Sequence, residues 1–235
     1  MHVAIVTVGD ELLSGDTTNT NATWLCARLD ERGVIVERVT TVPDRIEDIS
    51  RVVNEYRADY DAVIVTGGVG PTHDDVTMDG VAAAIGRTTA PNEAALSWLT
   101  EHGGYSADDL TEGTTDLPAG AEMIPNDVGV APGAIVEDIY VLPGVPAEMK
   151  AMFERIEGHF EGKPTYSTVV AIDEPESTLL DRFTALREQF PVGVGSYPGE
   201  HVRVKLTGAD PEVVEAAAAW LAERSDVLED EPTEE

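Results

Sequence analysis

The chain has 235 residues, 42% of them apolar, which is enough for one large domain or for a medium domain and a small one. Its 45 acidic residues against 15 Lys and Arg give a formal net charge of −30, which argues against binding to DNA or to anionic membranes. The acids are spread along the chain, so we interpret them as a surface adapted to a salt-rich cytoplasm rather than as a mimic of nucleic acid.

Short apolar runs and amphipathic segments alternate through the first third of the chain. The runs are rich in β-branched residues and apolar on both faces, as in strands that are covered by helices on both sides. The expected strands are residues 3–9, 34–42 and 61–68, and the expected helices are residues 21–33, 45–57 and 76–87. Residues 9–21 are expected to form a polar loop. This order predicts a mainly parallel sheet in a three-layer α/β domain.

Cys26 falls inside the first expected helix, beside Leu25 and Leu29, so core packing suits it better than nucleophilic catalysis. A single cysteine cannot form an internal disulfide bond, which fits a reducing compartment. The N-terminal apolar run lacks a basic flank and is too short for a signal peptide. No segment approaches the length of a membrane span. We therefore expect a cytoplasmic protein.

The middle of the chain reads less regularly. A helix is expected at residues 92–104, followed by a connection rich in Gly and Thr over residues 105–120. A short strand, a loop, a hairpin-like pair and a helix then fill residues 121–156. The composition shifts near residues 161–164, which marks a domain boundary.

The remainder predicts a strand, a helix, two strands and a helix, an order that suits a small two-layer α+β module. We expect a first domain at residues 1–163, the small module at residues 164–228, and a disordered acidic tail at residues 229–235.

The stretch VTGGVGPTHDDVT, from Val65 to Thr77, ends the third expected strand. In open α/β sheets, ligands bind at the carboxyl ends of the strands. Glycines at such a place let backbone amides approach an anion. The adjacent Asp74 and Asp75 suit a metal ion that bridges them to a phosphate, although either could instead cap the next helix. The same ambiguity holds for Asp44, which follows the second strand.

Four loops carry a resemblance to a known family. VGDELLSGDTTNTNATWL, VPD, TGGVGPTHDDVT and LPGVPAEM agree in wording, order and spacing with the molybdopterin-binding domain superfamily of molybdenum-cofactor biosynthesis. Within it, the chain resembles the N-terminal part of the CinA family of competence- and damage-inducible proteins. Its second module is similar to the middle domain of that family, over ESTLLDRF and GSYPGEHVRVKLTG.

The resemblance implies catalytic roles for Asp44, Asp74 and Asp75, with Asp74 and Asp75 also binding a divalent metal ion. Oxygen ligands suit magnesium or manganese, and the family resemblance allows cobalt. The substrate-binding positions that it implies are Asp10, Glu11, Asn19, Asn21, Thr66, Gly67, Gly68, Gly70, Thr77, Gly133, Pro143, Gly144, Pro146 and Glu148.

What the resemblance implies about function leaves two alternatives. The first is a metal-dependent nucleotide pyrophosphatase that hydrolyses ADP-ribose or a related dinucleotide. The second is a molybdopterin-binding protein of molybdenum-cofactor biosynthesis without hydrolase activity. Both predict a small phosphate-bearing ligand, no nucleic acid, no membrane, and a homo-oligomer such as a dimer or trimer. A purely structural scaffold is harder to reconcile with four retained loops.

Proteins of the CinA family usually carry a further C-terminal domain that deamidates nicotinamide mononucleotide. The present sequence ends before such a domain would begin, so we expect no deamidase activity from it.

Overall fold

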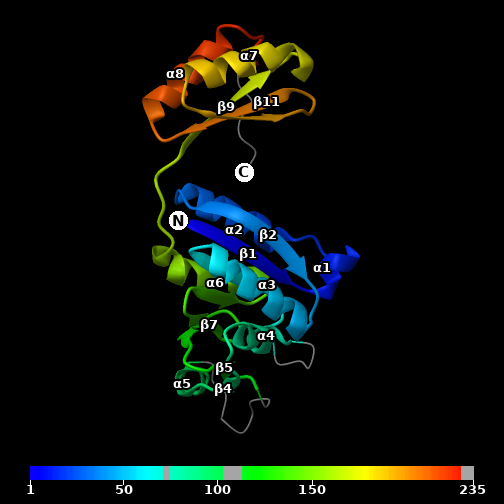
Figure 1. The fold of residues 1–235 in the computed structure, drawn as a ribbon, viewed down its shortest axis with the longest axis vertical. Helices are drawn as coiled ribbons and strands as arrows, with labels where there is room; N and C mark the ends of the chain where they lie inside the picture. Colours follow the sequence, from blue (N-terminus) through cyan, green and yellow to red (C-terminus); the bar gives the residue numbers. More distant parts are fainter. Residues whose placement is uncertain (71–74, 103–112, 229–235) are drawn as a thin grey trace. The chain divides into compact units, whose positions relative to one another are not determined.

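A computed structural model describes residues 1–70, 75–102 and 113–228 of the chain. The chain divides into two compact units, Met1–Gly162 and a second unit that begins at Lys163 (Figure 1). The predicted acidic tail at residues 229–235 lies outside the described residues.

A six-stranded sheet forms the centre of the first unit, in the order β2-β1-β3-β8-β7-β6. The strands β2, β1, β3 and β8 run parallel, and β7 and β6 continue the sheet antiparallel. Their bounds are β1 His2–Val8, β2 Ile35–Val42, β3 Ala62–Thr66, β6 Glu122–Ile124, β7 Gly133–Val136 and β8 Ile139–Leu142. The predicted mainly parallel α/β sheet is confirmed.

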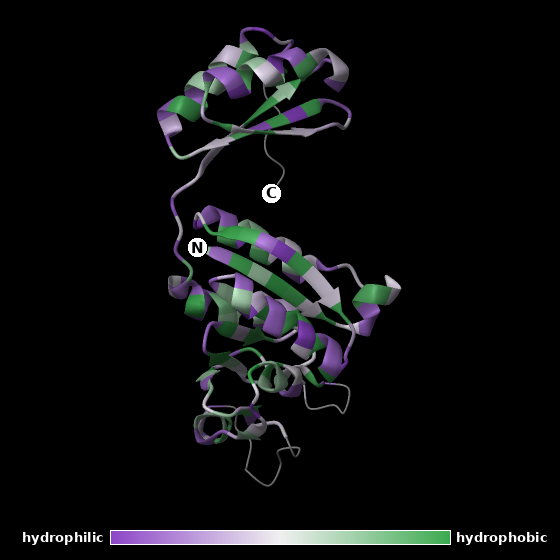
Figure 2. Ribbon diagram, viewed as in Figure 1, coloured by the Kyte–Doolittle hydropathy of each residue, from purple (hydrophilic) through white to green (hydrophobic). Residues whose placement is uncertain are grey.

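Helices cover both faces of this sheet. Successive side chains of a strand point to opposite faces, and those of the central strands are apolar on both, so each face needs a covering layer. On one face, Val63 and Val65 pack in a buried cluster with Ile49 and Val81. On the other face, Ile64 packs in a second cluster that includes Leu25 and Phe153. The helices that supply these residues are α2 Thr20–Glu31, α3 Ile46–Asp59, α4 Thr77–Ala84 and α6 Pro146–Ile156. Three layers result, with hydrophobic residues along the central strands and many hydrophilic ones on the outer helices (Figure 2).

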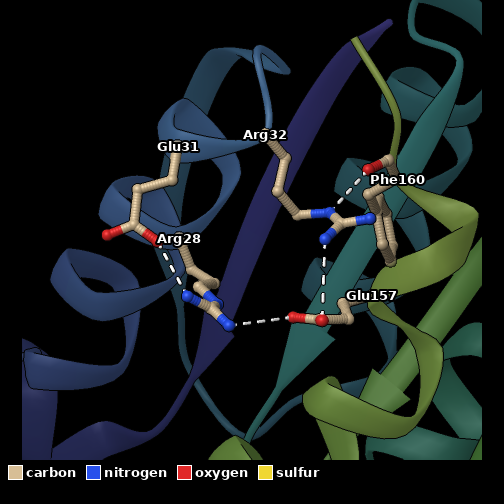
Figure 3. A network of polar contacts seen from close by, with 5 residues as sticks. All are labelled: Arg28, Glu31, Arg32, Glu157 and Phe160. Atoms are coloured by element: carbon tan, nitrogen blue, oxygen red, sulfur yellow. Dashed lines mark hydrogen bonds and ion pairs between the residues drawn. The ribbon is translucent and has the colours of Figure 1, made fainter. Parts of the chain in front are cut away.

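Ion pairs join α2 to the segment after α6. Glu157, in the short 3-10 helix η2 Glu157–His159, accepts from Arg28 at 3.2 Å and lies 3.6 Å from Arg32. Arg28 also pairs with Glu31 at 2.8 Å, and Arg32 Nε donates to the Phe160 carbonyl oxygen at 2.8 Å (Figure 3). The network holds the end of the first unit against α2.

Two local predictions are wrong. The expected polar loop at residues 9–21 contains a helix, α1 Asp10–Ser14, which Gly15 ends with a left-handed φ of 81°. The expected connection at residues 105–120 contains strand β5 Asp116–Pro118, which pairs antiparallel with β4 Thr89–Pro91. Elements of three to five residues are too short to show a hydrophobic period, so the sequence pattern does not reveal them. Helix α5 Glu93–Glu101 lies between β4 and β5 in the chain.

The second unit has its own core. Its antiparallel sheet has the order β10-β11-β9, and buried Val204 and Leu206 pack with Leu179 and Leu221 of its helices. The elements are β9 Tyr166–Ile172, α7 Glu176–Gln189, β10 Gly193–Tyr197, β11 Val202–Gly208 and α8 Pro211–Ala222. This is the predicted small α+β module. Across the described residues of both units, no helix has the length and apolarity needed to cross a bilayer.

Candidate functional site

Four loops meet where β1, β2, β3 and β8 reach their carboxyl ends. The Gly9 amide donates to the Val42 carbonyl oxygen at 3.1 Å, which joins the loops after β1 and β2. The Gly67 amide donates to the Leu142 carbonyl oxygen at 3.2 Å, which joins the ends of β3 and β8. Parallel strands bring these loops to one edge, and it is at this edge that open α/β sheets bind ligands.

The turn after β3 requires glycine. Gly67 and Gly68 have φ values of 105° and 60°, and a side chain on Gly67 would collide with the carbonyl oxygen of Val8. A Cβ on Gly144 would lie 3.2 Å from the Gly67 Cα, so the facing loop also approaches closely. Residues with a Cβ seldom adopt the angles of Gly67 and Gly68, and the close approach of the two loops explains the glycine at position 144.

This turn presents backbone donors. Within the described residues, the amides of Gly68, Val69 and Gly70 donate no hydrogen bond. The Gly68 carbonyl oxygen accepts from the amide of Thr77, the first residue of α4, at 3.0 Å. The Thr77 hydroxyl is buried and has no partner among the described residues. Successive unpaired amides after a left-handed residue form a concavity suited to an anion.

Acidic side chains surround the same turn. Asp44 Oδ2 accepts from the Asp10 amide at 2.9 Å, and Asp44 Oδ1 lies 3.1 Å from where a Cβ of Gly68 would be. Burial raises the pKa of Asp44, and the nearby carboxylates of Asp10, Glu11 and Asp75 raise it further, against the hydrogen bond from Asp10. A carboxylate cluster of this kind repels a bare phosphate.

The helix-capping alternatives are wrong for the residues that the structure describes. Arg45, not Asp44, occupies the N-cap of α3, and Val76, not Asp75, occupies the N-cap of α4. Neither cap residue accepts a side-chain hydrogen bond from its helix. Asp44 and Asp75 are thus not placed by capping, and both face the glycine turn.

A cleft of about 90 Å³ opens on one side of Gly67. Asn19 caps α2 by accepting from the Ala22 amide at 3.1 Å, and its Nδ2 donates to the Thr7 hydroxyl at 3.0 Å. Asn21 Nδ2 donates to the Gly144 carbonyl oxygen at 2.7 Å. The cleft is lined by Thr7, Val8, Glu11, Leu12, Thr17, Thr18, Asn19, Thr20, Asn21, Thr66, Gly67, Gly144 and Pro146.

A second cavity of about 150 Å³ reaches the other end of the turn, where Gly70 and Asp75 line it together with Asp79 and Asp116. A Cβ on Gly70 would lie 2.7 Å from the Asp75 carboxylate, so the two residues are in contact. The glycine turn therefore borders both cavities, through Gly67 on one side and through Gly70 on the other.

The metal ligands predicted from the sequence are not assembled by the described residues. In residues 1–70, 75–102 and 113–228, no three His, Cys, Asp or Glu side chains are grouped so that they could hold a metal ion. Asp74 lies outside the described residues, so the metal site at Asp74 and Asp75 stays a prediction.

Three of the predicted substrate-binding residues make contacts within the protein. Glu148 Oε2 accepts from Asn126 Nδ2 at 2.7 Å, and Asn126 Oδ1 accepts from the amides of Val128 and Gly129. Glu148 thus stabilises, through Asn126, the loop that contains Val128 and Gly129. Gly133 is buried in β7, where a Cβ would lie 2.6 Å from Met152 Cε and the Val141 carbonyl oxygen, so packing requires glycine there. Pro143 accepts from the Thr66 hydroxyl at 2.7 Å.

The sequence analysis did not predict a role for Thr7 or for Asn126. Thr7 is 1% exposed and connects Asn19 to Thr41 through its hydroxyl, at 3.0 and 2.9 Å. A threonine within an otherwise apolar strand is the signal that could have found it, because a buried hydroxyl needs a partner. Asn126 lies among other polar residues in a loop, so nothing in the sequence distinguished it.

Residues 4–159 match the family model described as "Probable molybdopterin binding domain". A protein of Archaeoglobus fulgidus is 38% identical over 95% of this chain and 97% of its own length. A CinA-like protein of Citrifermentans bemidjiense is 35% identical over 95% of this chain, which spans 58% of that longer protein.

Among solved structures, the protein CinA of unknown function from Thermoplasma acidophilum is similar, with a TM-score of 0.63 and 34% identity. The likeness covers 68% of this chain and 97% of that one. The resemblance inferred from the four loops is confirmed, and the chain belongs to the molybdopterin-binding domain family and, within it, to the CinA-type proteins.

Proposed function

We propose that the carboxyl edge of the six-stranded sheet binds a phosphorylated pterin of the molybdopterin type. Membership of the molybdopterin-binding domain family supports this proposal. The observation that carries it is the turn at Gly67–Gly70. There, the amides of Gly68, Val69 and Gly70 have no partner among the described residues, and Gly67, which precedes them, lines the cleft.

The two parts of such a ligand need different surroundings. A phosphate requires hydrogen-bond donors, which the amides of Gly68, Val69 and Gly70 supply. A planar ring requires a cleft with apolar walls and a few polar contacts. Val8, Leu12 and Pro146 line the cleft beside Gly67. The carboxylates of Asp44 and Asp75 oppose the phosphate, and a cation bound with the ligand would offset their charge.

Pterin fluorescence tests this proposal. The chain is purified in high salt, because its formal charge of −30 needs screening, and titrated with a pterin that carries a side-chain phosphate. We expect saturable binding by the wild-type chain. Gly67→Ala should weaken it strongly, because the new side chain collides with Val8. Failure of the wild-type chain to bind any phosphorylated pterin would contradict the proposal.

A second candidate, hydrolysis of the ADP-ribose pyrophosphate to AMP and ribose 5-phosphate, is favoured by the carboxylate cluster. Asp44 lies beside Gly68 and within electrostatic range of Asp10, Glu11 and Asp75. A divalent ion at this cluster, held with the help of Asp74, would offset pyrophosphate charge and help to activate water. The described residues contain no group of three such side chains that could hold a metal ion, so this candidate requires a further ligand, for which Asp74 is the predicted residue.

The assay for this activity uses ADP-ribose, high salt and magnesium, manganese or cobalt. We expect AMP to form with the wild-type chain and to fall to background with Asp75→Asn. Equal AMP formation by both proteins would mean that the activity does not arise at this edge of the sheet. Pterin binding without AMP formation would leave the first proposal standing alone.

Two further expectations accompany both candidates. We propose a dimer or trimer in the cytoplasm, and light scattering of the purified chain at high salt measures its assembly state. High ionic strength favours association, because it screens the repulsion between acidic surfaces.

A further inference from the structure

The second unit leaves one face of its sheet uncovered by its own helices. Both α7 and α8 pack on the face that carries Val170, Val204 and Leu206 (Figure 1). Side chains alternate along a strand, so the intervening residues point to the opposite face, where Val169 and Tyr197 are 56% and 53% exposed. The residues of this open face are Ser167, Val169, Ala171, Gly193, Gly195, Tyr197, Arg203, Lys205 and Thr207.

The open face differs in charge from the chain as a whole. Acids outnumber Lys and Arg by 45 to 15 in the sequence, yet none of the open-face residues is Asp or Glu. Arg203 and Lys205 lie two positions apart on β11, the central strand. Asp173, which directly follows β9, lies 3.3 Å from His201 at one end of the face. The open face is thus a locally positive surface, and its charge suits an anionic partner.

Hydroxyl groups lie beside the two cations. Tyr197 pairs with Arg203 across β10 and β11, and a Cβ on Gly195 would lie 3.2 Å from the Tyr197 hydroxyl oxygen. The ring of Tyr197 therefore lies against the backbone of Gly195. Thr207 Oγ1 lies 2.5 Å from where a Cβ of Gly193 would be. Both hydroxyls can donate a hydrogen bond to a carboxylate, so this face offers O–H donors as well as positive charge.

The chain leads from α8 to the outer edge of the same sheet. The Asp173 amide donates to the Asp226 carbonyl oxygen at 2.8 Å, and Val227 forms an antiparallel bridge with Ile172. The Leu228 amide then donates to the Ala171 carbonyl oxygen at 3.1 Å. Residues 226–228 therefore run antiparallel along β9, on the side away from β11.

The register of this bridge predicts where the next residues would pair. Residues 229–235, which lie outside the described residues, read EDEPTEE and include five acids. Continued pairing places Asp230 opposite Val169, and residues directly opposite each other share a face of the sheet. Pro232 has no amide hydrogen, so the ladder should end before it.

The distance to the two cations suits long side chains. Neighbouring strands lie about 4.8 Å apart, so a segment beside β9 would lie about 10 Å from β11, with β9 between them. A carboxylate side chain from the segment and the side chain of Arg203 or Lys205 can meet across the small or apolar residues Val169 and Ala171. Geometry and charge therefore favour the same occupant for the open face.

We propose that the acidic segment 229–235 binds along the outer edge of β9 and places its carboxylates against Arg203 and Lys205. The open face is then an anion-binding surface that the chain covers with its own segment. An exposed ion pair is weak by itself, but the contacts of Leu228 hold the start of the segment beside β9. Such tethering gives a local concentration on the order of millimolar. An acidic peptide from another protein reaches the face by displacing the segment.

Paramagnetic NMR of the full chain tests this inference. A nitroxide label is attached at position 233 after Thr233→Cys, in a chain that also carries Cys26→Ala, so that no charged residue is changed. The label broadens the amide signals of residues close to it. We expect strong broadening at Val169 and Lys205, and much weaker broadening at Leu186 of α7, which packs on the other face.

Two pairs of substitutions distinguish the open face from charge in general. Arg203→Gln with Lys205→Gln should lower the ratio of bound to free segment by roughly fivefold or more. Arg51→Gln with Arg187→Gln, on α3 and α7, changes the net charge equally and should leave the broadening unchanged. Added salt should weaken the broadening in the parent chain. The amide signal of buried Val204 reports whether each variant is folded.

Other results would overturn the inference. Broadening that is absent from β9 and β11 would show that the segment does not bind there. Broadening that survives Arg203→Gln with Lys205→Gln, or that falls equally in the control pair, would show that the two cations do not hold the segment. If labelled chains broaden the signals of unlabelled chains in a mixed sample as strongly as their own, a second copy supplies the segment and the intramolecular contact is excluded.

Discussion

Asp44 accepts a hydrogen bond from the backbone amide of Asp10 at 2.9 Å, and this contact joins the loop after β2 to the first turn after β1. The two residues are 34 positions apart in sequence. The bond fixes one carboxylate oxygen of Asp44 and leaves the other beside Gly68. The acidic side of the site is thus built across two strands, as expected for an edge where parallel strands end.

The electrostatic state of Asp44 makes stability depend on pH. Its pKa is raised by burial and by the carboxylates of Asp10, Glu11 and Asp75, so the folded chain holds the Asp44 proton more tightly than the unfolded chain does. Stability therefore falls as the pH rises from the unfolded pKa through the folded pKa. Asp44→Asn removes this loss, and its amide oxygen can still accept from Asp10.

We expect Asp44→Asn to melt a few degrees higher than the wild-type chain at pH 7 and at the same temperature at pH 3. Thermal melts at both pH values measure this, and added salt should reduce the difference because it screens the carboxylates. A variant less stable than the wild-type chain at pH 7 would show that the charge of Asp44 is compensated in the folded protein.

Alanine substitutions at Gly67 and Gly86 distinguish the loss of stability caused by an unfavourable backbone angle from the loss caused by a steric clash. Both have positive φ, 105° and 69°, but a Cβ on Gly67 meets the Val8 carbonyl oxygen, whereas one on Gly86 meets nothing within 4 Å. Gly86→Ala should lower the free energy of unfolding by about 1 kcal/mol. Gly67→Ala should lower it by about 3 kcal/mol or more, since a clash adds to the same term. Urea denaturation of both variants checks this, and equal losses would contradict the close approach.

The layers of the fold can be predicted from the sequence, whereas short elements and contacts between distant loops at the site cannot. Alternation of apolar strands with amphipathic helices is a strong local signal, and it located β1, β2, β3 and their helices. Helix α1 and strand β5 were missed, because so few residues carry no period. The bond between Asp44 and Asp10 depends on strand order, which no local pattern contains, so the capping hypothesis for Asp44 could not be rejected from the sequence.

Glycines were the most informative site residues, but for two different reasons. Gly67 and Gly68 adopt left-handed angles at the cavity edge, as the motif suggests. Gly133 meets Met152 and the Val141 carbonyl oxygen in the core. A sequence shows only that a side chain is absent, and the surroundings decide whether ligand or packing fills the space.

Glu157 connects two arginines, and its removal should matter in a salt-dependent way (Figure 3). Glu157→Gln loses the charge that pairs with Arg28 and Arg32. Because all three side chains are only partly exposed, we expect a loss of about 1 kcal/mol in the free energy of unfolding at low salt, and less at high salt. Glu31→Gln is the matched control, since Glu31 is 62% exposed and pairs with Arg28 alone. A larger effect of the control than of Glu157→Gln would contradict the central place of Glu157.

Glu174 connects Asp226, near the end of the described chain, to Arg182 and Thr178 of α7. The pKa of Glu174 should report these contacts. The hydrogen bond from Arg182, together with those from the Asp226 amide and the Thr178 hydroxyl, lowers the pKa of Glu174 from 4.5 to about 2. The folded second unit therefore prefers the ionised form, so the stabilisation is present above the unfolded pKa and is lost as the pH falls toward 2. Carbon-13 NMR of the Glu174 carboxyl should show a midpoint near 2. Glu174→Gln should unfold the second unit more easily than the wild-type chain at pH 7, with the difference shrinking between pH 4.5 and 2. A midpoint near 4.5 would show that Arg182 does not hold Glu174 in solution, and Asp226 would then lack its anchor.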